Sequence, residues 1–298
     1  MINPTLGFIG LGRMGLPMCS LIAKHHKVVA YDNVPEICQQ GTTFGLNVAK
    51  SLQSLIEEIT RLQKPRIIWL MVPAVNVNVL ITKLLPSLES GDIIIDGGNS
   101  SFSDSKQQEQ KLGNAGIHFV TIGCSGGLKG AANGPPMTVS CKFPVLKKIE
   151  PILASLGNNY THFEGCGFGH LAKGIHNAIE YGMMESIAEG VELYFRYGFT
   201  QDEIINTFKV WAKGSIIESA LINCVIECLE HNNFSHKKYI KQSETVKLLE
   251  EICNNSIDTP TIDSAIKVRK NPASISDKTR TTLALLRKTF GGHAISDK

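Results

Sequence analysis

What the sequence lacks argues against several classes of protein. It contains no run of about 18 apolar residues, so we expect no membrane-spanning helix. Residues 1–5 carry no basic segment and the apolar run after them is short, so we expect no secretory signal peptide. The net charge is only +3, and no long basic run alternates with aromatic residues. Nucleic acid is therefore not an expected partner.

Charged residues and paired cysteines are also scarce. Charged residues make up 19% of the 298 residues, below the share of about a quarter that globular proteins usually have. A low charged fraction suggests additional buried surface, such as a subunit interface. The eight cysteines are scattered and include no Cys-x-x-Cys pair. We therefore expect free structural thiols in a reducing cytoplasm, with neither disulfides nor a bound metal.

The first residues have the pattern of a dinucleotide-binding turn. An apolar segment at 6–9 leads into a Gly-x-Gly-x-x-Gly motif, a helical pattern follows to about residue 25, and a second apolar segment at 28–31 ends in an aspartate. Such glycines permit a tight turn, close approach of a pyrophosphate and close packing of helix on strand, and the helix N-terminus offers N–H groups to phosphate. The expected cofactor-binding residues are Gly10, Leu11, Gly12, Arg13, Met14, Gly15 and Asp32.

Asp32 favours NAD over NADP. Its carboxylate would accept hydrogen bonds from the ribose hydroxyls and would repel a 2′-phosphate. The next residues, Asn33 and Val34, supply no arginine that would compensate. The alternative is an ordinary surface aspartate after a strand. We expect NAD as the cofactor, with NADP less favoured.

Apolar segments alternate with helical patterns in the first half of the chain, and only helical patterns follow. Residues 67–72 form a continuous apolar run, as expected of a strand that is buried on both faces. The order predicts an α/β fold, with a Rossmann-type doubly wound sheet in residues 1–164 and an all-α substrate-binding and dimerisation domain in residues 165–298. Further strands are predicted at 93–95, 117–122, 137–141 and 160–163, and later helices at 167–197, 201–212, 215–231, 244–254, 261–270 and 277–290.

Two loops that follow predicted strands are candidates for ligand binding. Asp96-Gly97-Gly98-Asn99-Ser100 follows one strand, and Ser125-Gly126-Gly127 follows the next. Doubly wound folds bind ligands at the carboxyl ends of strands, and glycines can present backbone N–H groups to an anion. Plain turn chemistry would explain the same glycines. By the same strand-end argument, Val72, Pro73 and Asn99 are expected to contact the cofactor.

The helical stretch at 169–185 carries a lysine, an amide and a carboxylate on one face. A helix advances about 100° per residue, so Lys173, Asn177 and Glu180 fall within about 60° of one another. His176 and Tyr181 flank them, and most neighbours are apolar or small. An apolar setting disfavours the charged form of a lysine and suits it to act as a base. The alternative is an exposed helix whose charges only confer solubility.

Three motifs together resemble the 6-phosphogluconate dehydrogenase family, within the wider β-hydroxyacid dehydrogenase superfamily. They are the 96–100 loop, Ser125-Gly126-Gly127 with Gly130-Ala131, and Lys173…His176-Asn177…Glu180-Tyr181-Gly182, in that order. Residues 287–293 also resemble the tail of the family, so that the resemblance covers nearly the whole chain. The chain is similar to the short branch of the family, whose members often prefer NAD.

The resemblance implies oxidative decarboxylation of 6-phosphogluconate to ribulose 5-phosphate by a homodimer, in which the tail residues come from the partner subunit. Lys173 would take the proton of the substrate 3-hydroxyl. After the loss of CO₂, Glu180 would protonate C1 of the resulting enediol, and Asn177 would hold the substrate between them. Tyr181, Arg287 and His293 would reach the phosphate. The substrate-binding residues implied are Asn99, Ser125, Gly126, Gly127, His176, Tyr181, Arg287 and His293.

Two segments depart from the family pattern. Where the resemblance implies a phosphate-binding arginine, the chain has Glu218, inside the helix predicted at 215–231. A Lys/Arg-Trp-Thr segment of the family is not recognisable, and residues 241–245 read Lys-Gln-Ser-Glu-Thr. Both changes remove positive charge. Two alternatives therefore stay open: the same mechanism on another sugar acid or β-hydroxyacid, for instance an unphosphorylated one, and a non-catalytic NAD-binding regulator.

Overall fold

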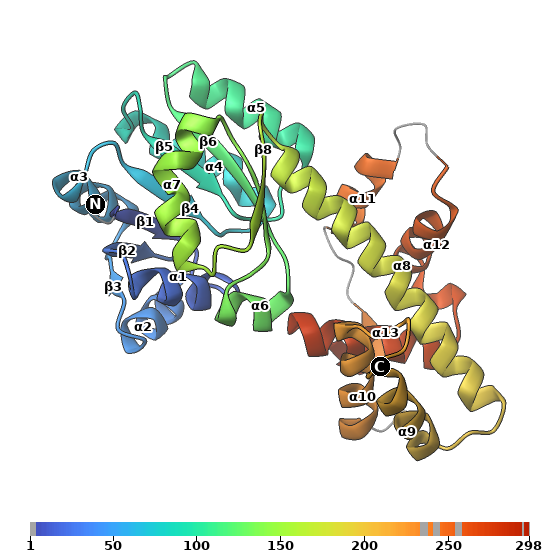
Figure 1. Cartoon of the computed structure of the whole chain (residues 1–298). Helices are drawn as coiled ribbons and strands as arrows, with labels where there is room; N and C mark the ends of the chain where they lie inside the picture. The colour runs from blue at the N-terminus through green and yellow to red at the C-terminus, as the bar shows by residue number, and fades with distance from the viewer. Residues whose placement is uncertain (1–3, 233–237, 241–244, 254–257, 294, 298) are drawn as a thin grey trace. The chain divides into compact units, whose positions relative to one another are not determined.

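The computed structural model describes residues 4–232, 238–240, 245–253, 258–293 and 295–297. The chain forms two compact units, Met1–Gly174 and Ile175–Lys298 (Figure 1). Helix α8, Phe168–Arg196, begins in the first unit and continues into the second. The domain boundary expected after residue 164 stays a prediction.

An eight-stranded sheet forms the centre of the first unit. Its strand order is β3-β2-β1-β4-β5-β6-β7-β8, and every neighbouring pair is parallel except β6 with β7. The order runs outward from β1 in both directions, as in a doubly wound sheet. The strands are β1 (Leu6–Ile9), β2 (Val28–Tyr31), β3 (Asn47–Val48), β4 (Ile67–Leu70), β5 (Ile93–Asp96), β6 (His118–Cys124), β7 (Met137–Ser140) and β8 (Tyr160–Phe163).

Helices cover both faces of this sheet, which therefore has a hydrophobic core on each side. Ile67 and Trp69 of β4 belong to one core, and Ile68 and Leu70 belong to the other. Successive side chains of a strand point to opposite faces, which explains the continuous apolar run. The first core includes side chains of α1 (Gly15–Ala23), α6 (Gly127–Asn133) and α7 (Phe143–Ser155), and the second those of α3 (Leu52–Leu62), α4 (Ala74–Leu84) and α5 (Phe102–Gly113), while α2 (Pro35–Thr43) connects β2 to β3.

The second unit is built around the C-terminal part of α8. One core joins α8 to α9, α10 and α13, and a smaller one joins it to α11 and α12. The helices are α9 (Gln201–Trp211), α10 (Ala220–His231), α11 (Thr245–Cys253), α12 (Pro260–Lys270) and α13 (Asp277–Gly291). The predicted fold class, a doubly wound sheet followed by a helical region, is confirmed.

Two details of the second unit differ from the expectation. The helix predicted to begin at residue 215 begins at Ala220, because the Ser219 side chain accepts a hydrogen bond from the Ile222 amide and caps it. The unit also contains a short antiparallel ribbon of β9 (Lys238–Ile240) and β10 (Ile295–Asp297), where only helices were predicted. None of the helices that the structure describes is both long and apolar enough to cross a membrane.

Candidate functional site

The glycine-rich turn after β1 has the steric features that a dinucleotide requires. Gly10 has φ +100°, and a Cβ atom there would collide with the Met71 carbonyl oxygen. A Cβ atom on Gly15 would collide with the Gly10 carbonyl oxygen, because α1 packs closely on the end of the strand. A Cβ atom on Gly12 would meet nothing within 4 Å. The turn therefore leaves open space at Gly12, where a pyrophosphate could approach the backbone.

Asp32 lies against this turn. It is buried, its Oδ2 atom accepts a hydrogen bond from the Leu11 amide at 2.7 Å, and its Oδ1 atom accepts one from the Val34 amide at 3.0 Å. Each carboxylate oxygen has a second lone pair, so a ribose hydroxyl can still be bound. Met14, at the N-cap position of α1, provides no side-chain cap. The Leu16 amide already donates to the Gly12 carbonyl oxygen at 3.0 Å and Pro17 has no N–H group, so of the first three residues of this helix only Gly15 has an amide for an anion.

The end of β4 brings the cofactor turn close to the loop at residues 96–100. The added Cβ of Gly10 would lie 3.0 Å from Val72 Cγ1, and that of Gly98 would lie 2.9 Å from the Val72 carbonyl oxygen. Pro73 directly precedes α4. Val72, Pro73 and the neighbourhood of Asn99 therefore belong to one edge of the sheet, and their contact with the cofactor stays a prediction.

The 96–100 loop is braced from inside by Asp96. This side chain is buried, and its two oxygens accept hydrogen bonds from the Gly98 amide at 2.9 Å and from Ser100 Oγ at 2.6 Å. Because Asp96 organises the loop, the exposed Asn99 is presented at its tip. Sequence reasoning counted Asp96 only as part of the motif and missed this supporting role.

The Ser125–Gly127 turn and Lys173 both adjoin the end of β6. Gly126 and Gly127 have φ of +91° and +58° and lead into α6, and the Ser125 amide donates to the Pro136 carbonyl oxygen at 2.9 Å. A Cβ atom on Gly123 would collide with Lys173 Cβ, so α8 packs directly on the strand. Lys173 is half-buried. Burial raises the pKa of the neighbouring Cys124 thiol to about 12, although the charge of Lys173 opposes the shift.

The rest of the predicted site lies in the second unit, further along α8. Asn177 is buried, and Glu180 is half-buried. His176 Nδ1 lies 3.6 Å from Glu180 Oε2 and 3.4 Å from Asn177 Oδ1. His176 thus contacts two other predicted residues of the same helix, and a protonated His176 would form an ion pair with Glu180.

A buried arginine that the sequence analysis missed lies next to Tyr181. The Arg269 guanidinium stacks 4.5 Å from the centre of the Tyr181 ring, and its Nε atom donates to Glu185 Oε1 at 2.9 Å. Among the described residues, Arg269 Nη1 and Glu185 Oε2 have no hydrogen-bond partner. Burial raises the pKa of Glu185 to about 7, and Arg269 opposes that rise. Arg269 stands between lysines in the last turn of α12, where basic residues are usually exposed, so no pattern indicated its burial.

Arg287 is a second buried cation of this region. Its burial lowers the pKa of the guanidinium, Tyr181 and Glu180 raise it, and Arg269 lowers it further. Arg287 lies near Tyr181 of its own chain, because α13 belongs to the same helical unit. The implied contribution of the tail to a partner subunit stays a prediction. The Phe290 and His293 rings are 6.5 Å apart, and the His293 amide donates to the Arg287 carbonyl oxygen.

Glu218 does not lie in a helix. It is exposed in the turn before α10, and its Oε2 atom accepts a hydrogen bond from the Gly214 amide at 2.6 Å. The expectation that Glu218 lies inside a helix is wrong, because α10 begins at Ala220 and the Glu218 carboxylate is bonded within the preceding turn. Most of the segment at 241–245 lies outside the described residues.

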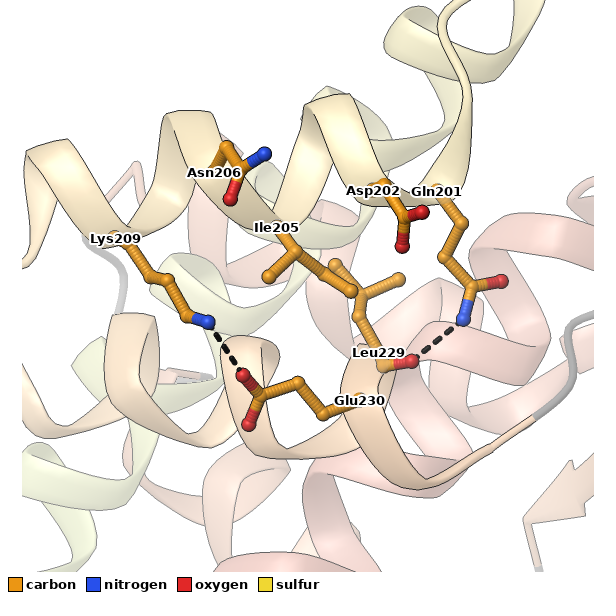
Figure 2. A pocket seen from close by; sticks show the side chains of 7 residues that line it. All are labelled: Gln201, Asp202, Ile205, Asn206, Lys209, Leu229 and Glu230. Carbon is orange, nitrogen blue, oxygen red and sulfur yellow. Dashed lines mark hydrogen bonds and ion pairs between the residues drawn. The ribbon is translucent and has the colours of Figure 1, made fainter.

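A hollow of about 370 Å³ in the second unit contains none of the predicted site residues. Three of its polar side chains are engaged within it: Lys209 pairs with Glu230 at 2.7 Å, and Gln201 Nε2 donates to the Leu229 carbonyl oxygen at 2.5 Å (Figure 2). We therefore do not place the candidate site there. It is lined by Gln201, Asp202, Ile205, Asn206, Lys209, Leu229 and Glu230.

Comparisons with protein families cover nearly the whole chain. The family model described as the NAD binding domain of 6-phosphogluconate dehydrogenase matches residues 5–165. The model of the C-terminal domain of 6-phosphogluconate dehydrogenase matches residues 169–286. Both units therefore resemble the corresponding parts of the same enzyme family.

Individual relatives include both short and long proteins. YqeC of Bacillus subtilis (strain 168), itself only provisionally named a 6-phosphogluconate dehydrogenase, is 32% identical over 98% of this chain and 99% of its own. The decarboxylating 6-phosphogluconate dehydrogenase of Candida albicans is 38% identical over 76% of this chain and 46% of its own length. The chain thus spans about half the length of the long relatives that it matches.

Two solved structures have a similar fold. The 6-phosphogluconate dehydrogenase of Plasmodium falciparum, determined with NADP+ and with 6-phosphogluconate, has a TM-score of 0.78 and 25% identity, covering 89% of this chain and 61% of its own. The 3-hydroxyisobutyrate dehydrogenase of Mycobacterium tuberculosis has a TM-score of 0.74 and 20% identity, covering 97% and 99%. The latter likeness concerns the fold alone.

Proposed function

Because this chain belongs to the 6-phosphogluconate dehydrogenase family, we propose that it oxidises and decarboxylates 6-phosphogluconate to ribulose 5-phosphate. Its membership makes it a nicotinamide-dependent oxidoreductase of the β-hydroxyacid dehydrogenase superfamily. The observation that carries the proposal is the arrangement along α8. This helix holds a lysine and a carboxylate seven residues apart and continues directly to Tyr181, beside which two arginines are buried.

The buried arginines favour a phosphorylated substrate. Arg269 and Arg287 both lie near Tyr181, and Arg269 Nη1 has no hydrogen-bond partner among the described residues. Arg269 has one strongly bonded carboxylate, Glu185, and its Nη1 atom has no hydrogen-bond partner among the described residues, so an anion would neutralise the remaining positive charge. A phosphate monoester supplies the negative charge that these arginines would bind. Position 218 therefore need not be an arginine for the substrate to be phosphorylated.

The proposed chemistry needs a base and an acid at opposite ends of a small sugar acid. Lys173 removes the proton of the 3-hydroxyl, and the bound oxidised nicotinamide supplies the hydride acceptor. The resulting 3-keto acid loses CO₂ because the ketone lies β to the carboxylate. Protonated Lys173 stabilises the enediolate oxygen. Glu180 then protonates C1 of the enediol, the carbon that was C2 of the sugar acid. Asn177 and His176 hold hydroxyl groups between the two, with Asn99, Ser125, Gly126 and Gly127 toward the carboxylate.

The proposed cofactor is NAD. The open space at Gly12 and the Gly15 amide at the start of α1 suit a pyrophosphate. Asp32, held at the turn by the Leu11 amide, would bind ribose hydroxyls. A 2′-phosphate would meet this carboxylate without a neighbouring arginine in the sequence, because Asn33 and Val34 follow.

The proposed assembly is a homodimer formed mainly by the helical units. Ile175, Ile179 and Met183 recur at four-residue intervals on α8 and are exposed in the single chain. Such an apolar stripe on a long helix is suited to cover its counterpart in a second copy. Equilibrium sedimentation should give twice the chain mass at micromolar concentration, and Ile179→Glu should shift the equilibrium toward monomer. A wild-type monomer would contradict this assembly.

The function is tested with 6-phosphogluconate, gluconate and 3-hydroxyisobutyrate, following nicotinamide reduction and CO₂ release together. We expect both signals in equal amounts with 6-phosphogluconate. Lys173→Met should lower kcat by about 10²-fold to 10⁴-fold, the range for loss of a general base. The affinity for NADH should stay nearly unchanged. Lys209→Met, on the hollow of the second unit, is the matched control and should keep full activity.

The other outcomes distinguish the alternatives. Turnover of an unphosphorylated acid alone would favour the same mechanism on another substrate. Binding of NADH without turnover of any acid would favour a regulator. Substantial activity of Lys173→Met would overturn the assignment of the base.

A further inference from the structure

A buried histidine connects three elements of the first unit. His170, in the first turn of α8, is only 1% exposed. Its Nε2 atom lies 3.1 Å from the carbonyl oxygen of Asp96, at the end of β5, and its Nδ1 atom lies 2.7 Å from Ser105 Oγ, in the first turn of α5. The imidazole therefore joins the 96–100 loop, α5 and α8.

The partners of the ring fix its protonation. A carbonyl oxygen can only accept, so Nε2 carries the proton that it donates to Asp96. Burial lowers the pKa of His170, although the nearby Asp96 carboxylate opposes the shift, and the ring is therefore neutral. Nδ1 is then an acceptor for the Ser105 hydroxyl, whose Oγ atom also lies 2.7 Å from the Ser101 carbonyl oxygen. The single hydrogen of this hydroxyl is shared between the two acceptors, and the same tautomer donates from Nε2 to Asp96.

The same turn of α8 is held to the sheet by two strand hydroxyls. The Gly169 amide donates to Ser140 Oγ at 3.0 Å, and Thr138 Oγ1 donates to the Gly169 carbonyl oxygen at 2.8 Å. Lys173 follows one turn later and packs against Gly123. The backbone that carries Lys173 thus begins in a largely buried polar network, which His170 connects to the loop of Asn99.

We propose that His170 is a positioning residue that couples the 96–100 loop to the first turn of α8 and thereby sets the place of Lys173 relative to Asn99. This role rests on the proposed function, in which Lys173 is the base and Asn99 binds substrate or cofactor. A displacement of a reacting group by about 1 Å can lower a rate about 10²-fold. A link between the two segments would therefore be felt in kcat.

Three substitutions at this position separate the two hydrogen bonds. Glutamine places an amide N–H near the position of Nε2 and can still donate to Asp96. Asparagine is shorter and can serve only the Ser105 side, and phenylalanine fills the space with no polar atom. We expect His170→Gln to keep kcat within about threefold, and His170→Asn and His170→Phe to lower kcat about tenfold to a hundredfold, with a smaller change in KM.

His26 offers a matched control because it too is a buried histidine that bridges two segments of the first unit, in its case through two carbonyl oxygens. Its ring nitrogens lie 3.0 Å from Pro4 O and 3.1 Å from Pro151 O, at sites that the proposed mechanism does not use. His26→Asn should lower the melting temperature but leave kcat unchanged. The positioning role is overturned if His26→Asn lowers kcat as much as His170→Asn. It is also overturned if His170→Gln is as slow as His170→Asn, or if His170→Phe keeps the wild-type kcat.

Hydrogen exchange gives a measurement that does not need turnover. In His170→Asn and His170→Phe, the backbone amides of residues 96–100 and 169–174 should both exchange faster, and in His26→Asn they should not. If no sugar acid is turned over, the proposed function fails while this coupling is still tested. Unchanged exchange in the 96–100 loop of His170→Phe would overturn the inference by itself.

Discussion

Each unit of the molecule contains a buried ion pair of an arginine with a carboxylate, and the two pairs differ in how completely the arginine is bonded. In the first unit, Arg66 and Asp92 lie just before β4 and β5, at the edge opposite the predicted ligand site. In the second unit, Arg269 pairs with Glu185 beside Tyr181. The side chains of both pairs are less than one tenth exposed.

In the first pair every nitrogen of the guanidinium lies against an acceptor. Asp92 accepts from the Arg66 amide at 2.7 Å, from Arg66 Nε at 2.8 Å and from the Glu89 amide at 2.8 Å, and its Oδ2 atom forms an ion pair at 2.7 Å with Arg66 Nη2, an atom that makes no hydrogen bond among the described residues. Arg66 Nη1 also donates to the Ser87 carbonyl oxygen at 2.6 Å. Such a pair ties two strands and the preceding turn together, and nothing about it requires a ligand.

The second pair has one good hydrogen bond, from Arg269 Nε to Glu185, and one weak contact of Arg269 Nη2 with Met184 Sδ at 3.8 Å. A buried charge that is incompletely bonded costs stability, and such sites are common where a ligand binds. The difference teaches that burial of an arginine does not by itself indicate function. Each guanidinium has one nitrogen without a hydrogen bond among the described residues, but Arg66 Nη2 lies in an ion pair with Asp92, whereas Arg269 Nη1 has no ion pair there and lies beside Tyr181.

The largest expected effects come from removing each arginine. Arg66→Leu should lower the free energy of unfolding by about 3–5 kcal/mol, the usual cost of leaving a buried charge without its partner. Arg269→Leu should lower it less, since Glu185, whose pKa is raised to about 7, can take up a proton. Urea unfolding at neutral pH measures both.

Kinetics with the same two variants tests the comparison from the other side. Arg269→Leu should raise KM for 6-phosphogluconate at least tenfold, because a hydrogen bond to a charged group contributes about 1.5–3 kcal/mol. Arg66→Leu should leave KM unchanged in the folded fraction. The comparison is broken if Arg66→Leu changes KM and Arg269→Leu does not.

A smaller effect is expected in the pH dependence of stability. The folded protein keeps the Glu185 proton up to about pH 7, whereas the unfolded chain releases it near 4.5. Unfolding between these values releases a proton, so stability falls as pH rises through this window, by at most about 3 kcal/mol. Glu185→Gln should remove that part of the slope. Parallel stability curves of wild type and variant from pH 4.5 to 7.5 would show that Glu185 is ionised throughout.

The smallest effect concerns Asp32, a carboxylate bonded by two backbone amides rather than by an arginine. We expect kcat/KM to be about tenfold higher with NAD than with NADP, equivalent to about 1.4 kcal/mol. Asp32→Ser combined with Asn33→Arg should move the preference toward NADP by removing the repulsion and adding a cation. A wild-type preference for NADP would contradict the proposed role of Asp32.

The first unit was largely predictable because its pattern is local. The apolar run at 67–72 and the glycines after residues 6–9 report burial and backbone sterics directly, and β4 and the turn at Gly10 follow from them. The roles of His170 and Arg269 could not be predicted. Their partners, Asp96 and Glu185, lie 74 and 84 residues away. Such pairings depend on tertiary packing, which a periodicity along the chain does not contain.

Helix ends were the other source of error. The apolar spacing before Ala220 continues a helical pattern, so the predicted helix included Glu218. The Ser219 cap and the hydrogen bond from the Gly214 amide to Glu218 make a turn there instead. The ribbon of β9 and β10 has three residues in each strand, too few for an alternating pattern to be recognised.

The unbroken course of α8 over 29 residues limits how this chain can change in length. Lys173 and Glu180 are separated by about 10 Å along the helix axis, at about 1.5 Å per residue. A substitution between them alters one side chain and leaves this spacing intact. The insertion or deletion of one residue would instead rotate Glu180 by about 100° relative to Lys173. The segment is therefore more tolerant of substitution than of any change in length that is not close to a whole number of helical turns.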